Sequence, residues 1–272
     1  MPRRKTSPDT PLILGDTQTP GQVDSLQRGL EIMRLFDGGE TYLSLPDIAS
    51  RVGLSRITAE KLLSTLESYN FLRRIHNTEN YEAHAACLAL GRAAKRGIRA
   101  VQIASPHMRR LSDEFDVHVS FMTRERLQML VLEHCVPAGQ QTFRLQTGTQ
   151  IPIPYSASGR AYLWAQKPTT QAELINALKD TAADKSHRFM QGIYSAYQEL
   201  EENGWCFVAS PVTEQTNSVA TPVLDGSDGC RYVLAAMSTH NRVLQETLRN
   251  EVAPRLIDLA MRVSQEIQRT GE

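Results

Sequence analysis

The chain of 272 residues lacks several features that would assign it to a specialised class of protein. No apolar run approaches the ~18–20 residues that a membrane-spanning helix needs. The start of the chain contains basic side chains but lacks the apolar stretch of a secretory signal. Aromatic residues make up only 6% of the chain, against 41% hydrophobic residues, which is typical of a globular protein with aliphatic cores. We therefore expect a cytoplasmic protein, long enough for two domains of ordinary size.

Cysteine is scarce, and its spacing excludes the structures that depend on it. The four cysteines form no C-x-x-C pair, so the sequence predicts neither a zinc ribbon nor a disulfide framework. Each has at least one apolar or small neighbour in the sequence, which favours a small buried side chain. They are Cys87, Cys135, Cys206 and Cys230.

Catalytic and metal-binding motifs are also absent from the sequence. It contains no G-x-S-x-G elbow, no G-x-x-x-x-G-K-[ST] loop, no H-E-x-x-H motif and no G-x-G-x-x-G turn. In the run Glu133-His134-Cys135, neighbouring strand side chains point to opposite faces, so the three cannot converge on a metal. His118 lies between two valines, which favours a hydrogen-bonded strand histidine. We expect no catalytic residue, no metal site and no cofactor.

The formal net charge is zero, but the charge is unevenly distributed. Residues 51–99 contain 9 Lys and Arg against 4 Asp and Glu, whereas acidic residues predominate after residue 100. Residues 1–20 are rich in Pro, Thr and Asp, and we expect them to form a disordered arm. The cluster Arg3-Arg4-Lys5 in this arm is either a solvated tail or a contact to DNA phosphates.

Two short amphipathic segments lie between residues 44 and 68, after a third over 23–36. Residues 45–52 carry apolar side chains at helical spacing, and Ser44 is the predicted N-cap. Gly53 ends this helix, and Ser55 is placed to cap a second helix that repeats the same spacing. Two such helices joined by a tight glycine turn are the signature of a helix-turn-helix motif.

The second helix of this motif is predicted to expose side chains that suit DNA. A recognition helix enters the major groove through its N-terminal residues. We expect Arg56 to pair with guanine, and Thr58 to contact a base or a thymine methyl group. Ser55 and Lys61 are better placed for phosphates, and Ser44 is a further candidate. The alternative for each residue taken singly is the solvated face of an ordinary helical hairpin.

Residues 69–82 are predicted to form a strand, a turn and a second strand, with turn-forming residues at 77–80. A hairpin that directly follows a recognition helix is a wing. We expect Arg73, Arg74 and His76 to reach a phosphate or the minor groove. Residues 21–83 are therefore predicted to be a winged helix-turn-helix DNA-binding domain.

The recognition helix resembles that of a known family. The run Ser55-Arg56-Ile57-Thr58-Ala59-Glu60-Lys61-Leu62-Leu63 closely matches the S-[KR]-x-T-[AV]-x-[RK]-L-L stretch of IclR-type transcription regulators. The resemblance covers roughly residues 23–268. It implies a helix at 84–104 that links two domains and helps them to dimerise, although a solvated connector is the alternative. It also implies a GAF-like effector-binding domain at 105–270.

Beyond the linker the pattern alternates between strands and helices. Pro106 is expected in the first turn of a helix that ends near Phe115. Helices are also predicted near 170–180, 188–203 and 243–268. The six predicted strands lie at 117–125, 127–135, 141–146, 205–212, 218–225 and 232–239. This pattern predicts an α+β fold, with helices packed on one side of a six-stranded antiparallel sheet.

Four stretches of this domain resemble family motifs. The L-P-x-H-A-T-A-x-G-K loop corresponds to residues 151–160, the helix before the G-Y-x-x-D-D-E-E strand to 194–204, the C-I-A-A-P-V strand to 218–223, and the A-A-L-S-V-S strand to 235–240. Hydroxyl groups there suit a carboxylate or a phenol, although caps and strand ends are the alternative role. The candidate effector-binding residues are Tyr155, Ser156, Ala157, Ser158, Ser218, Ser238 and His240.

The chain departs from the family pattern at several of these places. The acidic D-D-E-E run is replaced by Val208-Ala209-Ser210-Pro211. The usual histidine of the loop is Pro154, the usual cysteine is Ser218, and a serine near the strand end is His240. The missing carboxylates remove both a repulsion toward anions and a set of hydrogen-bond acceptors. The effector is therefore expected to differ from the commonest one of the family.

Together these features predict a ligand-responsive transcription regulator, a repressor rather than an activator, that binds a palindromic site on double-stranded DNA. It would act as a dimer or a dimer of dimers, away from membranes, and sense a small carboxylate or aromatic metabolite. Two alternatives stay open. One is a DNA-binding regulator with a degenerate, ligand-independent sensor, and the other is an enzyme of unknown type whose N-terminal helices only mediate association.

Overall fold

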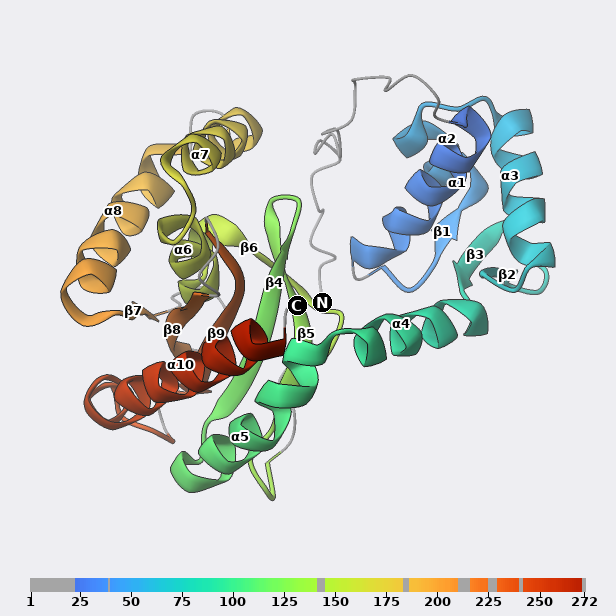
Figure 1. Cartoon of the computed structure of the whole chain (residues 1–272). Helices are drawn as coiled ribbons and strands as arrows, with labels where there is room; N and C mark the ends of the chain where they lie inside the picture. The colour runs from blue at the N-terminus through green and yellow to red at the C-terminus, as the bar shows by residue number, and fades with distance from the viewer. Residues whose placement is uncertain are drawn as a thin grey trace. The chain divides into compact units, whose positions relative to one another are not determined.

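The computed structural model describes residues 23–38, 40–140, 145–182, 186–209, 216–224, 229–239 and 242–270 (Figure 1). The described residues divide into two compact units, an N-terminal one that ends at Gly97 and a C-terminal one that begins at Ile98. The units have separate hydrophobic cores. The expected arm at 1–20 lies outside the described residues.

The N-terminal unit has the element order of a winged helix-turn-helix. Its small sheet is antiparallel, with strand order β1-β3-β2. The predicted helix-turn-helix and wing are confirmed. The elements are α1 (Asp24–Arg34), the 3-10 helix η1 (Leu35–Gly38), β1 (Leu43–Ser44), α2 (Leu45–Val52), α3 (Arg56–Ser68), β2 (Leu72–Arg74), β3 (Asn80–Ala83) and α4 (Ala85–Gly97).

Local side-chain chemistry fixes where α2 and α3 begin and end. The hydroxyl of Ser44 accepts a hydrogen bond from the backbone N–H of Asp47, and the hydroxyl of Ser55 accepts one from Thr58. Both serines therefore cap their helices, as predicted. Gly53 ends α2 with a φ of 67°, a left-handed conformation that glycine adopts without a steric penalty. The inward faces of these helices meet in the core of the unit, which includes Ile32, Ile48, Ala59, Leu63, Leu72 and Tyr81.

The segment predicted as one linker helix at 84–104 consists of two helices. α4 ends at Gly97 and α5 (Arg99–Phe115) begins two residues later, because Ile98 has an extended backbone with φ −87° and ψ 98°. Pro106 lies inside α5 and does not start a new helix there. A proline at this place removes one backbone donor from the helix, and the helix nevertheless continues to its predicted end at Phe115.

The C-terminal unit is built on a six-stranded antiparallel sheet with strand order β6-β5-β4-β9-β8-β7. The strand expected at 141–146 is wrong in place, because Leu145 and Gln146 belong to no strand and residues 141–144 lie outside the described residues. The third strand comes later, at β6. The strands are β4 (His118–Glu125), β5 (Gln128–Cys135), β6 (Gln150–Pro152), β7 (Cys206–Ala209), β8 (Thr216–Leu224) and β9 (Cys230–Thr239).

The helices of this unit follow the predicted order with two interruptions. A 3-10 turn, η2 (Ile153–Tyr155), precedes the first helix after β6, and a π-turn at Leu248–Val252 interrupts the predicted helix over 243–268. The α-helices are α6 (Ala157–Trp164), α7 (Pro168–Ala182), α8 (Ser186–Asn203), the short α9 (Gln245–Thr247) and α10 (Ala253–Thr270).

Helices cover both faces of the sheet, so the prediction of helices on one side is wrong (Figure 1). α5 and α10 pack on one face of the sheet, which we call the α10 face. α6 packs on the other face, which we call the α6 face, and α7 and α8 lie on the outer side of α6. Alternate residues of β9 enter two different cores. Leu234 and Ala236 lie in the core under α10, whereas Val233 and Ala235 lie in the core under α6. Continuous apolar strands of this kind are typical of a sheet covered on both faces.

Candidate DNA-binding and effector-binding sites

The N-terminal end of α3 presents an exposed face. Arg56, Ile57, Thr58 and Lys61 are all exposed, and Ile57 keeps 69% of its surface in contact with solvent. The opposite face of the same helix carries Ala59 and Leu63, which are buried in the core. The helix is thus anchored along one side and projects the predicted base-reading side chains from the other.

The serines of the motif are engaged in the structure of the helix ends. The Ser55 hydroxyl lies 2.9 Å from the hydroxyl of Thr58 as well as 3.2 Å from its backbone nitrogen. The Ser44 hydroxyl donates to the carboxylate of Asp47 at 2.6 Å. Both serines therefore act as helix caps in this structure. Any contact that they make to a DNA phosphate must use hydrogen-bonding groups of the hydroxyl that the cap leaves unused.

Carboxylates pair with two of the predicted DNA-binding arginines. Nη2 of Arg56 lies 2.5 Å from Oε1 of Glu79, which is the residue just before β3. Arg73 on β2 forms an ion pair with Glu82 on β3, and its Nε donates at 2.8 Å. These carboxylates neutralise part of the positive charge that the count of Lys and Arg over residues 51–99 indicates.

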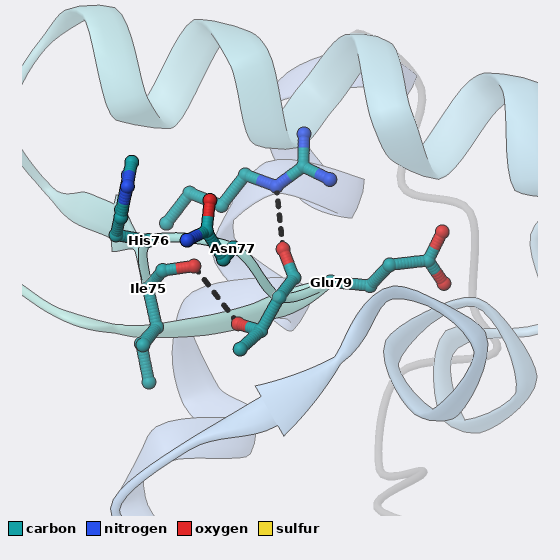
Figure 2. Close-up of a pocket in the computed structure, with 6 residues that line it drawn as sticks. Ile75, His76, Asn77 and Glu79 are labelled. Atoms are coloured by element: carbon teal, nitrogen blue, oxygen red, sulfur yellow. Dashed lines mark hydrogen bonds between the residues drawn. The ribbon is translucent and has the colours of Figure 1, made fainter.

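The turn of the wing is organised by its own backbone. Arg74 donates from Nε to the carbonyl of Thr78 at 2.9 Å, and Thr78 donates from its hydroxyl to the carbonyl of Ile75 (Figure 2). Asn77 takes a positive φ of 59°, which asparagine tolerates better than most residues. The side chains of His76 and Glu79 leave this turn in different directions (Figure 2). His76 is exposed, as a contact to DNA requires.

In the C-terminal unit, the predicted effector loop forms the turn before α6. Ser156 caps α6, since its hydroxyl accepts the N–H of Gly159 at 3.0 Å and donates to the carbonyl of Pro152 at 3.1 Å. Ser158 is buried and donates to the Ser156 hydroxyl at 3.3 Å. Tyr155 is 55% exposed, and its ring meets the edge of Phe189 on α8. The loop therefore exposes the ring of Tyr155, whereas the hydroxyls of Ser156 and Ser158 are hydrogen-bonded to each other.

Gly159 allows this loop to lie directly on α6. A β-carbon at residue 159 would come within 2.2 Å of the carbonyl oxygen of Ile153 and within 2.4 Å of its Cα atom. Both are backbone atoms, so no side-chain rotation would relieve the contact. The glycine is required for the fold of the loop that carries Tyr155, Ser156 and Ser158.

The structure brings only some of the predicted effector residues together. Ala157 is buried in the α6-face core, where its carbonyl accepts from the Cys206 thiol at 3.4 Å. Ser218 pairs with Met237 across β8 and β9 and shares the α6 face with it, and its hydroxyl donates to the carbonyl of Val208. Ser238 is one residue further along β9, so it faces α10.

The predicted set is therefore divided by the sheet. The loop residues 155–158 and Ser218 belong to the α6 face, and Ser238 cannot join them from the opposite face. His240 lies outside the described residues.

A buried polar chain on the α6 face was missed by the sequence reasoning. His118 and Ser120 are both only 1% exposed, and they lie two residues apart on β4. The Ser120 hydroxyl lies 2.8 Å from Nδ1 of His134 on β5, and Nε2 of His134 lies 3.2 Å from Nδ1 of His118. His118 then bonds Gln140 through Nε2 at 3.2 Å. The alternation of His118 and Ser120 was the one signal in the sequence that pointed to a shared face.

The chain of bonds has a single direction when both imidazoles are neutral. Gln140 donates its amide N–H to the carboxylate of Asp116 at 2.5 Å, so its carbonyl oxygen accepts from His118. His118 then accepts from His134, and His134 accepts from Ser120. Burial lowers the pKa of His118, and burial together with the neighbouring His118 lowers the pKa of His134 to about 4. Both rings are therefore neutral near pH 7.

Models of one protein family match almost the whole of the described chain. The model described as the IclR helix-turn-helix domain matches residues 25–76, and the one described as the bacterial transcriptional regulator IclR C-terminal domain matches residues 93–265. The chain belongs to the IclR family of transcriptional regulators. It is thus a DNA-binding regulator and not an enzyme.

Known IclR proteins resemble the chain over its length. A curated relative, the HTH-type transcriptional regulator TsaQ1/TsaQ2 of Comamonas testosteroni, is 28% identical over 91% of this chain and 90% of its own. The crystal structure of an IclR family transcriptional regulator from Brucella abortus superimposes with a TM-score of 0.85 at 28% identity, covering 97% of this chain and 99% of that one. An IclR homologue from Microbacterium hydrocarbonoxydans, solved in complex with 4-hydroxybenzoate, has the same fold at 18% identity, with a TM-score of 0.66 over 90% of this chain and 99% of its own.

Two departures from the IclR pattern have a visible position. Pro154, in place of the family's histidine, is buried in η2, where its carbonyl accepts from Nε of Arg160 at 3.1 Å. Val208, in place of an acidic residue, is buried in the α6-face core, whereas residues 210 and 211 lie outside the described residues.

Among the helices of the described segments, none combines the length and the apolar character that a membrane span requires. The described residues also hold no group of three His, Cys, Asp or Glu side chains placed to bind a metal ion.

Proposed function

We propose that this IclR-family regulator is a ligand-responsive repressor that binds a palindromic operator through α3 and the wing. The observation that carries the proposal is the exposed N-terminal end of α3, where Arg56 and Thr58 project from a capped helix. This end of a recognition helix reaches the base edges of the major groove. Phosphate contacts are assigned to Ser44, Ser55 and Lys61, and contacts to a phosphate or the minor groove to Arg73, Arg74 and His76.

A gel-shift titration tests this proposal with DNA from upstream of the protein's own gene and its neighbours. Arg56→Ala is expected to weaken specific binding by about 5- to 150-fold, because a bidentate arginine–guanine contact discriminates by about 1–3 kcal/mol. Arg262→Ala is the matched control, since Arg262 is an exposed arginine on α10 and is expected to leave affinity unchanged. Binding should also weaken steeply with salt. Equal binding by both variants would refute the assignment of α3 as the reading helix.

The proposed dimer is supported by apolar side chains that the N-terminal unit leaves in solvent. Helix α4 has no buried residue, and its Leu88 is 71% exposed. Leu26 and Leu30 on α1 are exposed in the same way. A second copy would bury such residues, and two recognition helices would then meet two half-sites. Light scattering should show dissociation in Leu88→Glu and none in Leu244→Glu, a control at an exposed leucine of the other unit.

The proposed effector is a small carboxylate or aromatic compound bound on the α6 face, beside Tyr155 and Ser158. The 4-hydroxybenzoate of the Microbacterium homologue makes that compound the first probe for this protein. A ligand that binds the folded state raises the melting temperature, so a thermal-shift titration measures the site directly. Ser158→Ala should weaken the shift, because it removes a hydroxyl of the loop. Ser238→Ala, on the α10 face, should leave it unchanged.

The second candidate function is a DNA-binding regulator whose sensor no longer responds to a ligand. The buried Val208 favours this candidate, since it stands where the family carries carboxylates. It predicts operator binding with no thermal shift from any small carboxylate or phenol. Both candidates place the protein in the cytoplasm with chromosomal DNA.

A further inference from the structure

One ion pair links the recognition helix to the base of the wing. Nη2 of Arg56, the first residue of α3, lies 2.5 Å from Oε1 of Glu79. The side chains are 59% and 48% exposed, respectively. The backbone of Glu79 is held at the start of α2, because its carbonyl accepts the N–H of Leu45 at 3.0 Å. The pair therefore stands on a fixed backbone at both ends while its charged groups face solvent.

This pair uses fewer atoms than the neighbouring pair of Arg51 and Glu40. Arg51 holds both carboxylate oxygens of Glu40, at 2.5 and 3.1 Å. Arg56 holds Glu79 through one nitrogen and one oxygen. The pair uses Nη2 of Arg56 and Oε1 of Glu79, and within the described residues Nε and Nη1 of Arg56 and Oε2 of Glu79 make no hydrogen bond. The pair consequently keeps donors and an acceptor side by side for another partner.

That arrangement matches the major-groove edge of a G·C base pair. Guanine presents two acceptors, N7 and O6, and the cytosine beside it presents the N4 amino donor. A guanidinium has five N–H groups in a rigid fork, so it can give two to guanine and keep one on a carboxylate. The second oxygen of that carboxylate can then accept from cytosine N4. An isolated arginine on a flexible stem lacks this fixed orientation.

We propose that Arg56 and Glu79 read one G·C pair of each half-site together. Arg56 contacts guanine, and Glu79 orients the guanidinium and accepts from the cytosine amino group. Glu79 is thereby a specificity-determining residue of the DNA-binding surface. This inference rests on the proposed function, since it assigns α3 to the major groove.

Selection from a pool of duplexes with a randomised core tests the proposal without knowledge of the operator. Wild type, Arg56→Ala, Glu79→Gln, Glu79→Ala and the control Glu82→Ala are each selected from the same pool. Wild type and Glu82→Ala are expected to enrich a site with a fixed G·C pair in each half. Glu79→Ala is expected to lose most of a roughly fivefold or greater preference for that pair, and Arg56→Ala to lose it entirely. Glu79→Gln, which keeps an acceptor of the same shape, should retain part of it.

A second outcome would overturn the proposal. If Glu79 only repels DNA, both substitutions at 79 will strengthen binding to every duplex by a similar factor and leave the enriched site unchanged. An enriched site and an affinity that are both unaffected by Glu79→Ala would overturn it equally. Glu79→Gln is nearly isosteric, so its result stands even if the alanine variant melts early. If wild type enriches no sequence at all, the proposed function fails, and that result is distinct from failure of the Glu79 assignment.

Discussion

The two units of this chain place their polar side chains in opposite environments. On the proposed DNA-binding surface, Arg56 and Arg73 are exposed and pair with carboxylates in solvent. On the α6 face of the C-terminal unit, Ser120 and His118 are buried and neutral, and they are bonded in a chain with His134. An exposed pair contributes only ~0.2–1 kcal/mol to stability. A buried polar group that loses its partner costs ~1–3 kcal/mol.

Polar side chains therefore have different roles in the two units. The N-terminal unit keeps its cations in solvent, so DNA can reach the donors of Arg56 that Glu79 leaves free and can replace the Glu82 carboxylate on Arg73 at little cost. The C-terminal unit fixes its buried polar groups in one hydrogen-bonded pattern, and a substitution there leaves a buried group without its partner. Substitutions should therefore be costly in the second unit and mild in the first.

The largest effect is expected from Gly159→Ala. The added β-carbon would collide with the backbone of Ile153, so the loop must move away from α6. We expect a loss of at least ~3 kcal/mol in the free energy of unfolding of the C-terminal unit, measured by chemical denaturation. Gly192→Ala is the matched control, because the three atoms nearest to its added β-carbon belong to the end of the Arg160 side chain and not to the backbone. Equal stability of the two variants would show that the loop is not built on this close approach.

Acid should destabilise the C-terminal unit through His134. Its pKa is about 4 in the folded chain and about 6.5 when unfolded, so the unfolded chain binds the proton more tightly. The contribution of neutral His134 to the free energy of unfolding is fully present above pH ~6.5 and is lost as the pH falls toward 4. We expect a loss on the order of 2 kcal/mol, after allowance for solvent that still reaches the ring. His134→Asn should flatten this part of the pH profile, whereas His76→Asn on the exposed wing should not.

A smaller effect is expected from Ser55→Ala. The substitution removes the cap of α3 and should cost about 1 kcal/mol in the N-terminal unit, with little change in the C-terminal unit. Helical circular dichroism during thermal unfolding measures it. Ser55→Asp supplies another capping side chain and should restore the stability while weakening DNA binding, because it adds a negative charge beside the phosphates. A restored stability with unchanged DNA affinity would place Ser55 away from the DNA.

The smallest effect is expected from Glu40→Gln. Glu40 and Arg51 form a two-bond pair, but both side chains are more than two-fifths exposed. We expect a change below ~1 kcal/mol that shrinks further in high salt. Chemical denaturation at two salt concentrations measures it. A loss as large as that of Gly159→Ala would contradict the contrast drawn between the two units.

Features set by neighbouring residues could be predicted from the sequence. The caps at Ser44 and Ser55 and the turn at Gly53 involve partners within four residues, and all three were predicted correctly. The central strands were recognisable by their apolar alternation, and the recognition helix by its motif. The N-terminal unit is dominated by such local signals.

Features set by distant pairing could not be predicted in the same way. Ser218 and Ser238 were grouped because both carry hydroxyls, but their faces depend on a register in which Ser218 pairs with Met237. The hydrogen bond between His118 and His134 joins residues 16 apart on adjacent strands.

Helix boundaries near the linker were also predicted incorrectly. The break at Ile98 was missed because an isoleucine gives no turn signal. Pro106 was predicted to begin a helix because helix interiors seldom contain proline. The apolar run in β9 did indicate burial on both faces, and it was read as one-sided.

The short outer strands of the six-stranded sheet have a consequence for the protein at high concentration. The outer strands are β6, which has three residues and ends in Pro152, and β7, which has four. A strand with unpaired backbone groups at the rim of a sheet is a template for association with other chains, and short length and proline both limit it. The sheet therefore offers little backbone for intermolecular strand addition. The proposed dimer accordingly uses helix side chains such as Leu88 and does not use strand backbone.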